Sequence, residues 1–219
     1  MAPHGDDGPL PAGRFGAWLD HLEAALRGQG DSNVPCDGCT ACCTASQFVH
    51  LGPDDADALA HIPAELLFPA PRRPDGHLLM GYDEHGHCPM LVEGACSIYE
   101  HRPRACRTYD CRVFPGAGIA PDPEAQPGVA ARVRRWSFDE VDDADRVRHD
   151  AVRAAAAYVR AHRDVVPDAL RPANPTQHAV LAVELHATFL DRTAADGCPT
   201  LVEPPAAAVE ERLRALADG

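Results

Sequence analysis

The sequence predicts an α+β protein in which a small cysteine-rich domain with short strands packs against a mostly helical C-terminal part. Three observations lead to this prediction. Eight of the nine cysteines fall between residues 36 and 111, short apolar runs lie among them, and segments with helical periodicity follow residue 140. We expect three successive segments: a tail with an amphipathic helix (1–35), the cysteine domain (36–115), and a linker with a helical region (116–219).

The N-terminal segment is expected to begin as a polar tail and continue as one helix. Residues 1–14 are rich in proline and glycine and lack the apolar core of a secretory signal. No window of the chain approaches the ~18 consecutive apolar residues of a membrane span. In residues 14–27, apolar side chains recur at helical spacing, which predicts an amphipathic helix.

Short strands and turns are expected among the cysteines. Residues 47–51 read as a strand, and a short helix follows from Asp54 to about Ala60. Residues 62–74 are rich in proline and are expected to be irregular. A second strand is expected at 77–82, and a hairpin at 90–99 with its turn at Glu-Gly.

The C-terminal part reads as a linker followed by helices. Residues 116–128 carry proline, glycine and alanine without periodicity, and 129–138 are expected to form a strand that closes the small sheet. Helices are expected at 142–163, from an N-cap at Asn174 to about residue 192, and from about residue 205. These helices are expected to form a bundle.

The cysteines form two groups whose spacing is typical of metal ligands. Thiolates are soft anionic donors, and four of them can hold one Zn²⁺ or one iron–sulfur cluster. Without an export signal we expect the cytoplasm, where thiols stay reduced, so ligands or redox groups are favoured over disulfides. Cys198 stands apart and is expected to be an ordinary small side chain. The predicted metal ligands are Cys36, Cys39, Cys42, Cys43, Cys88, Cys96, Cys106 and Cys111.

Which metal is bound, and at one site or two, stays open at this point. Side chains of adjacent residues diverge, so Cys42 and Cys43 rarely serve one ion together. The C-x2-C and C-x4-C pairs suit structural zinc. The run C-x2-C-x2-C instead suits iron in a [4Fe–4S] cluster, with Cys88-Pro89 as the distant fourth ligand. His87, beside Cys88, is the histidine best placed to join a mixed site.

A longer pattern surrounds these cysteines. It consists of the run Cys36, Cys39, Cys42 and Cys43; Cys88-Pro89-Met90-Leu91; Cys96-Ser97-Ile98-Tyr99 with Arg102-Pro103; and Cys106-Arg107-Thr108-Tyr109-Asp110-Cys111. Over residues 34 to 115 the chain resembles the YkgJ-type CxxCxxCC cysteine-cluster family of zinc- or iron-chelating proteins. Thr40 stands where that family usually has glycine. Arg102 and Arg107 lie inside the matched pattern, and we expect them to offset the negative charge of the thiolates.

Charge narrows the choice of partners. The formal net charge is −13, and all 20 basic residues are arginine. Such an acidic body repels phosphate backbones, so nucleic acid is not expected as a partner, and the trio Arg132, Arg134 and Arg135 is expected to be a solvated face. A metal ion or cluster is the expected partner, a membrane is not expected, and no protein partner is indicated.

Three classes of function fit these observations. The first, which we favour, is a metal-chelating protein. The second is an enzyme, because one branch of the resembled family is similar to flagellin lysine methylases; no Gly-rich nucleotide loop supports it, and no catalytic residue can be named. The third is a redox protein that cycles its thiols or cluster.

Overall fold

The computed structural model describes residues 8–36, 38–71, 73–193 and 198–218, and it confirms the α+β class. The chain divides into two compact units that interleave along the sequence. The helical unit comprises Met1–Glu23, Cys111–Pro121 and Val133–Gly219, and the cysteine unit comprises Ala24–Asp110 and Asp122–Arg132. This division differs from the three successive segments expected. Across the described residues, every helix is too short or too polar to cross a bilayer.

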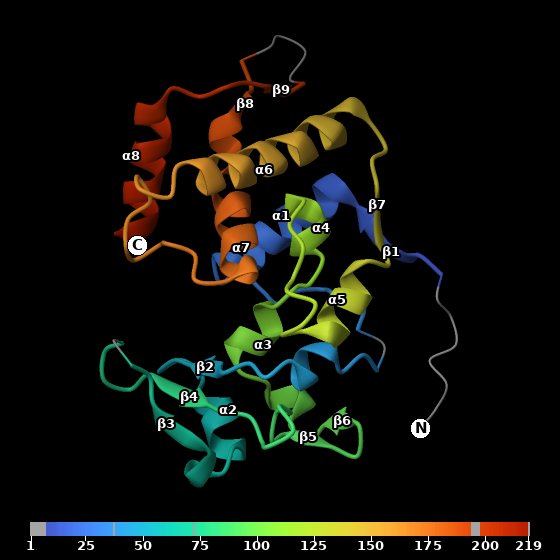
Figure 1. Cartoon of the computed structure of the whole chain (residues 1–219), viewed down its shortest axis with the longest axis vertical. Coiled ribbons are helices and arrows are strands. Elements are labelled where there is room, and N and C mark those ends of the chain that lie inside the picture. The colour runs from blue at the N-terminus through green and yellow to red at the C-terminus, as the bar shows by residue number, and fades with distance from the viewer. Residues whose placement is uncertain (1–7, 37, 72, 194–197, 219) are drawn as a thin grey trace. The chain divides into compact units, whose positions relative to one another are not determined.

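Helices dominate the helical unit because their apolar faces recur at helical spacing and pack on one another. Asp142 caps the longest helix by accepting a hydrogen bond from the Asp145 N–H (2.9 Å), and Asn174 caps the next through the Gln177 N–H (2.9 Å). Both helices are confirmed, although the second ends earlier than expected. The helices are α1 (Phe15–Leu26, in this unit up to Glu23), α4 (Val113–Ala117), α6 (Asp143–Ala161), α7 (Pro175–Leu185), the 3₁₀ turn η4 (His186–Phe189) and α8 (Ala206–Ala217) (Figure 1).

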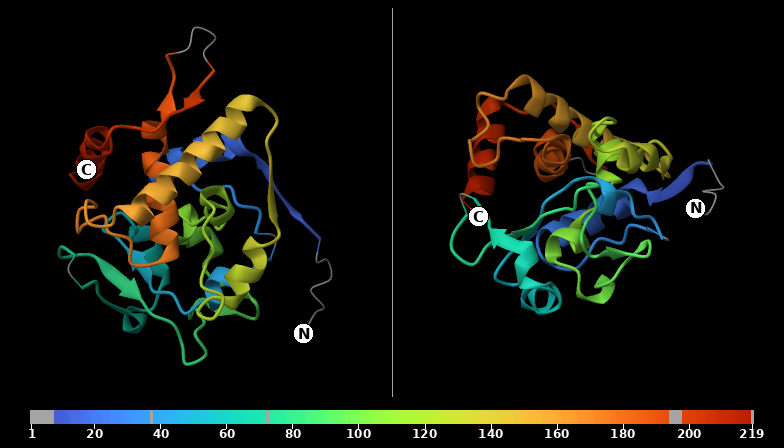
Figure 2. Two further views of the ribbon diagram at one scale, coloured as in Figure 1. Left: turned by 45° about the horizontal axis from the view of Figure 1, so that its top comes forward. Right: turned by 60° about the horizontal axis from the view of Figure 1, so that its bottom comes forward.

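Two small sheets complete the helical unit, and one of them corrects the prediction. Strand β1 (Leu10–Arg14) lies in the segment expected to be a polar tail, of which residues 1–7 fall outside the described residues. It pairs in parallel with β7 (Trp136–Asp139), so this second strand does not close the small sheet among the cysteines. Strands β8 (Leu190–Asp191) and β9 (Thr200–Leu201) form an antiparallel pair (Figure 2, left, orange and red).

A three-stranded antiparallel sheet, in the order β2-β4-β3, forms one side of the cysteine unit. Strands β2 (Val49–Leu51) and β4 (Leu78–Met80) confirm the two expected strands, and α2 (Ala56–His61) confirms the short helix. The expectation that residues 62–74 are irregular is wrong in part. The 3₁₀ turn η2 (Ala64–Leu66) leads into β3 (Leu67–Pro69), which pairs with β4 and ends at a proline, as an edge strand can.

The expected hairpin is β5 (Leu91–Val92) and β6 (Ala95–Cys96). Glu93 (φ 51°) and Gly94 (φ 81°) both adopt left-handed backbone angles, as the tight turn between two-residue strands requires. The 3₁₀ turn η3 (Tyr99–His101) and α3 (Arg104–Thr108) follow. Helix α5 (Pro127–Val133) corrects two predictions, because it occupies a segment assigned partly to a linker and partly to a strand. Helix α4 likewise occupies the start of the expected linker.

The cysteine unit has its own apolar core between the sheet, α2 and the hairpin. Two of the cysteines, Cys88 and Cys96, are half-buried and pack against this core. Their backbone positions are therefore fixed by apolar packing as well as by hydrogen bonds. The core residues are Leu51, Ala58, Ile62, Met80, Met90 and Ile98.

Candidate metal centre

The first cysteine group sits on two consecutive tight turns. The Cys39 N–H donates to the carbonyl oxygen of Cys36 (2.7 Å), which closes the C-x2-C loop. The 3₁₀ turn η1 (Ala41–Thr44) then carries the next pair, and the Cys43 N–H donates to the Thr40 carbonyl (2.9 Å). The sulfurs of Cys42 and Cys43 lie 4.0 Å apart. Turns of this kind present several sulfurs from a few residues, as a chelating loop must.

A backbone hydrogen bond joins the second cysteine group to the first. The Cys88 N–H donates to the carbonyl oxygen of Cys43 (2.7 Å), so residues far apart in sequence lie side by side. The Cys88 carbonyl in turn accepts from the Leu91 N–H (2.9 Å) at the start of the hairpin, where Cys96 lies opposite Leu91. The hairpin thus carries its cysteine next to the loop that holds the first group.

Helix α3 brings Cys106 to the same unit, and a buried aspartate fixes that helix. The Asp55 carboxylate accepts hydrogen bonds from the Arg104 N–H (2.6 Å) and the Gly52 N–H (2.9 Å). The carboxylate therefore ties the first turn of α3 to the turn after β2. The Arg104 guanidinium donates to the carbonyl oxygens of Ala25 (3.2 Å) and Leu26 (3.1 Å), which anchors α3 to the end of α1.

The thiols lie close enough to influence one another's ionisation. The pKa of the Cys36 thiol is raised to about 11, first by burial and then by the charges of Cys42 and Cys39. Burial likewise raises the pKa of Cys106 to about 12. The value of about 12 includes the charges of Cys42, Cys88 and Cys96, which act in the same direction as burial. Six thiols from two distant stretches of sequence therefore share one electrostatic neighbourhood.

Cys42 links the two groups of thiols. Its hydrogen bond with Cys43, and then burial of the sulfur, raise the pKa of the Cys42 thiol well above its ordinary value. Burial also raises the pKa of Cys88, and the charges of Cys96 and Cys42 act in the same direction. Because each thiolate would repel the others, these groups favour the protonated form until a cation replaces the protons.

Two arginines oppose this repulsion. The charge of Arg102 lowers the pKa of both Cys36 and Cys106, and its guanidinium lies 3.7 Å from the centre of the Tyr99 ring. The guanidinium of Arg132 donates to the carbonyl oxygen of Pro35 (2.9 Å), and its charge also lowers the pKa of Cys36. Arg132 belongs to the trio expected to be a solvated face, and sequence reasoning missed this contact.

Arg107 has a different environment from Arg102. Its guanidinium donates to the carbonyl oxygen of Arg102 (3.0 Å) and pairs with the carboxylate of Asp31 (2.9 Å). It therefore holds the backbone at Arg102 and the segment before the first cysteine. Its predicted role in offsetting thiolate charge stays a prediction.

Cys111 and Cys198 belong to the helical unit. The Cys111 sulfur accepts a hydrogen bond from the indole N–H of Trp136 (3.1 Å). Cys198 is half-buried. The His87 N–H donates to the Asp83 carboxylate (2.8 Å), and His50 pairs with His77 through ring nitrogens 3.0 Å apart.

The sulfur spacing bears on which metal fits. A tetrahedral Zn²⁺ with Zn–S bonds of about 2.3 Å brings its four sulfurs to about 3.8 Å from one another. In the part of the chain that the structure describes, no three cysteine sulfurs all lie within 4.8 Å of one another. An iron–sulfur cluster spans a larger volume than a single ion and therefore accepts more widely spaced thiolates. The donor set is chemically suited to either metal.

Gly86 provides a test of how the two cysteine groups are joined. Its φ is +79°, and a Cβ at this position would overlap the hydroxyl oxygen of Ser46. The Ser46 N–H donates a hydrogen bond to the Gly86 carbonyl oxygen (2.9 Å). We expect Gly86→Ala to lower the free energy of unfolding by more than about 1 kcal/mol, from backbone strain together with steric overlap. Denaturant unfolding of the full chain measures this change.

The matched control for Gly86→Ala is Gly94→Ala. Gly94 has a similar φ of +81°, but a Cβ there would meet no atom within 4 Å. Its cost is therefore backbone strain alone, and Gly86→Ala should be the more destabilising of the two. Equal destabilisation by both variants would show that the Ser46 contact contributes nothing.

Comparison with known proteins gives one match, to a family model. Residues 35–117 match the family model CxxCxxCC, described as a putative zinc- or iron-chelating domain. The match spans both cysteine groups and confirms the family resemblance of this segment. No curated protein and no solved structure gives a match.

Proposed function

We propose that the segment of residues 35–117 chelates zinc or iron through cysteine thiolates of the cysteine unit. The observation that carries the proposal is the backbone hydrogen bond from Cys88 to Cys43, which sets the second cysteine group beside the first. The family match supports metal chelation in general. The identity of the metal and the ligand set are our inference from the residues.

Six thiols are the proposed ligands. They come from η1 and the loop before it, from the hairpin and the segment that precedes it, and from α3. Their mutual effects on pKa support a single centre. When bound, the metal would supply positive charge that cancels thiolate repulsion and would cross-link these elements. Arg102 and Arg132 would offset the charge that remains. The six are Cys36, Cys39, Cys42, Cys88, Cys96 and Cys106.

We favour iron held as an iron–sulfur cluster over a single zinc ion. The three thiols of the run Cys36, Cys39 and Cys42 can seat one face of a cluster, and Cys88 or Cys106 can supply the fourth ligand. The wide sulfur spacing supports this choice. The enzyme and redox alternatives stay predictions, because no described contact favours either of them over chelation.

Anaerobic purification followed by metal and sulfide analysis tests the proposal. Brown protein with iron and acid-labile sulfide in equal amounts is the expected result. Colourless protein with stoichiometric zinc would support metal chelation but would contradict the proposed iron–sulfur cluster. Protein without bound metal that also fails to take up zinc or iron under reducing conditions would overturn chelation itself.

Metal affinity is expected to rise with pH. The pKa values of Cys36 and Cys106 are raised to about 11 and about 12, so these thiols hold their protons at neutral pH in the metal-free protein. Binding must displace those protons, and acidification therefore favours release of the metal. Zinc titrations by calorimetry in buffers of different ionisation enthalpy measure the protons released. Proton release near zero at pH 7 would contradict thiolate ligation.

A further inference from the structure

We propose that Asp57, His61 and His101 form a second metal site, separate from the cysteines, for a divalent transition ion of intermediate softness such as zinc, nickel or ferrous iron. The three side chains all belong to the cysteine unit. Their ligand atoms lie within 4.8 Å of one another, and no other such group occurs among the described residues. The proposal does not depend on the cysteine centre.

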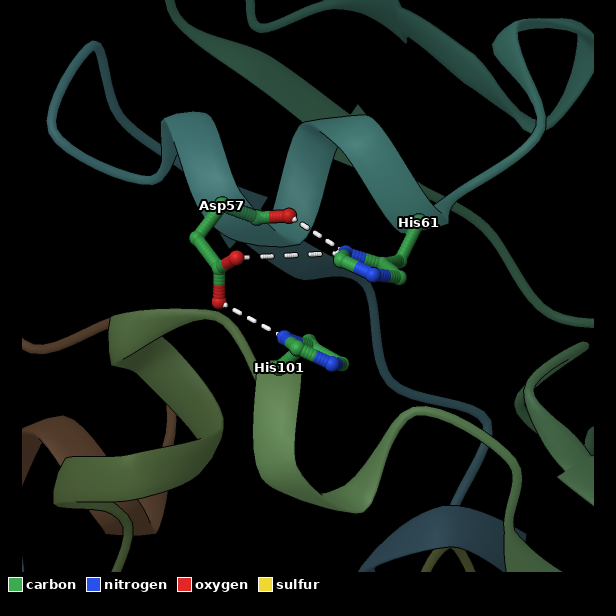
Figure 3. Close-up of side chains that lie close together, drawn as sticks. All are labelled: Asp57, His61 and His101. Carbon is green, nitrogen blue, oxygen red and sulfur yellow. Dashed lines mark hydrogen bonds and ion pairs between the residues drawn. The ribbon is translucent and has the colours of Figure 1, made fainter.

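Two of the ligands share one face of α2 and the third comes from η3. Asp57 and His61 are four residues apart, so a helix places them one above the other. η3 packs beside α2 and carries His101 to the same carboxylate (Figure 3). The His101 Nδ1 lies 2.9 Å from one Asp57 oxygen, and the His61 Nδ1 lies 4.0 Å from the other.

The two imidazole rings lie face to face, with centroids 3.6 Å apart and planes within 8° of parallel (Figure 3). Each ring turns a nitrogen toward Asp57. Stacked imidazoles repel one another when both are protonated, whereas one dication bound by both keeps both rings neutral.

The ligand distances are within reach of one ion. Two nitrogens and an oxygen bound to a tetrahedral Zn²⁺ lie about 3.3 Å apart, between the two distances observed here. The side chains of Asp57, His61 and His101 are 70%, 39% and 41% exposed, so small rotations meet little resistance. The His61 Nδ1 also pairs with the Asp57 backbone carbonyl oxygen (2.8 Å), and metal binding would replace this hydrogen bond.

The donor set defines the class of ion and the character of the site. Imidazole nitrogens favour zinc, copper, nickel and iron over magnesium or calcium, and one carboxylate is compatible with all of them. Three protein ligands leave the remaining positions to water. Because the ligands are exposed, the ion would exchange readily with solvent.

The test compares zinc uptake by the full chain and three variants, each with its cysteine centre already loaded. The variants are His61→Ala, His101→Ala and the control His85→Ala, which removes an exposed histidine outside the site. Equilibrium dialysis with Zn²⁺ and a weak chromophoric chelator counts the exchangeable ions. Removing a residue that hydrogen-bonds a metal ligand typically weakens metal binding about 10–100-fold. Removing a ligand itself should therefore weaken zinc binding by at least about 100-fold.

We expect the wild-type chain and His85→Ala to bind one exchangeable zinc that His61→Ala and His101→Ala lack. Zinc should also shift the imidazole ¹⁵N resonances of His61 and His101 but not those of His85. Melting curves of the zinc-free variants identify any variant that has lost its fold, and His101→Gln then replaces it. Equal zinc uptake by all the chains, with unshifted imidazole resonances, would show that Asp57, His61 and His101 form only ion pairs with one another. That result would overturn the proposed metal site. Because all chains carry the same cysteines, failure of the cysteine centre would leave this comparison intact.

Discussion

Cys36→Ser and Cys106→Ser are each expected to lose bound metal and stability together. Serine is a poor ligand for zinc or iron, so each variant lacks one thiolate ligand. When the metal is lost as a result, no positive charge remains to offset the repulsion among the other thiolates. Structural zinc sites contribute about 10–16 kcal/mol of binding free energy, so one ligand in four corresponds to about 3 kcal/mol. Metal analysis and denaturant unfolding of the same anaerobic preparations measure both effects.

Cys198→Ser is the control for these variants. Cys198 is half-buried in the helical unit and is not among the proposed ligands, so its replacement should leave the metal content unchanged. Cys111→Ser tests the one predicted ligand that lies in the helical unit and accepts a hydrogen bond from Trp136. If Cys36→Ser, Cys106→Ser and Cys198→Ser all retained the metal alike, the ligand assignment would fail.

Local patterns were enough to predict much of the fold. α1 and α6 have apolar faces repeated over several turns, and Asn174-Pro175 is a helix start that the structure confirms with a capping hydrogen bond. The Glu93-Gly94 turn likewise follows from residue type and spacing. In each case the deciding interactions join residues close together in the sequence.

Pairings between distant segments could not be predicted in this way. β1 contains proline and glycine and reads as a tail, yet it becomes a strand because β7, more than a hundred residues later, pairs with it. β3 likewise lies in a proline-rich segment that was expected to be irregular. It forms a strand because β4 pairs with it. α4 and α5 contain glycine and proline, which weaken any helical signal, and tertiary contacts override that weakness.

The candidate site shows the same contrast. Cysteine spacing identified the thiols, because chelating loops are local. Asp55 and Arg132 were missed since their roles depend on contacts with Arg104 and Pro35, which no sequence pattern records. The helix expected from Asp54 to about Ala60 contains Asp57 but ends one residue before His61. His101 joins these two residues only through the packing of η3 on α2.

Asp145→Ala is expected to be the most destabilising exchange of a polar side chain in the helical unit. The Asp145 carboxylate is buried and binds the Arg14 guanidinium (2.7 Å), the Gly16 N–H (3.1 Å) and the Val141 N–H (3.3 Å). It therefore ties β1 and the start of α1 to α6. Arg14 is half-exposed, so its ion pair with Asp145 contributes little by itself. Removing the buried carboxylate also leaves the Gly16 and Val141 N–H groups without their acceptor, which costs about 1–3 kcal/mol.

The effect of Asp145→Ala should depend on pH in a defined direction. Burial alone would raise the pKa of Asp145, but the hydrogen bond from Arg14 and those from Val141 and Gly16 outweigh it and lower the pKa. A carboxyl whose pKa is lowered in the folded state stabilises fully above its unfolded pKa of about 3.9 and loses this contribution as the pH falls through the folded value. The difference in unfolding free energy between wild type and Asp145→Ala should therefore be largest near pH 7 and shrink below about pH 4.

Asp143→Ala separates this contribution from a general loss of charge in α6. Asp143 lies in the same helical turn and pairs with Arg146, but its side chain is 81% exposed. Exposed pairs of this kind contribute about 0–1 kcal/mol, so Asp143→Ala should change stability little at any pH. Denaturant unfolding of both variants at neutral and acidic pH measures the two effects. If the buried Asp145 carboxylate anchors β1 and α1 to α6, Asp145→Ala should lower the free energy of unfolding more than Asp143→Ala does at neutral pH. This difference should disappear on acidification. Equal effects for the two variants, or a difference that persists unchanged in acid, would show that Asp145 is not that anchor.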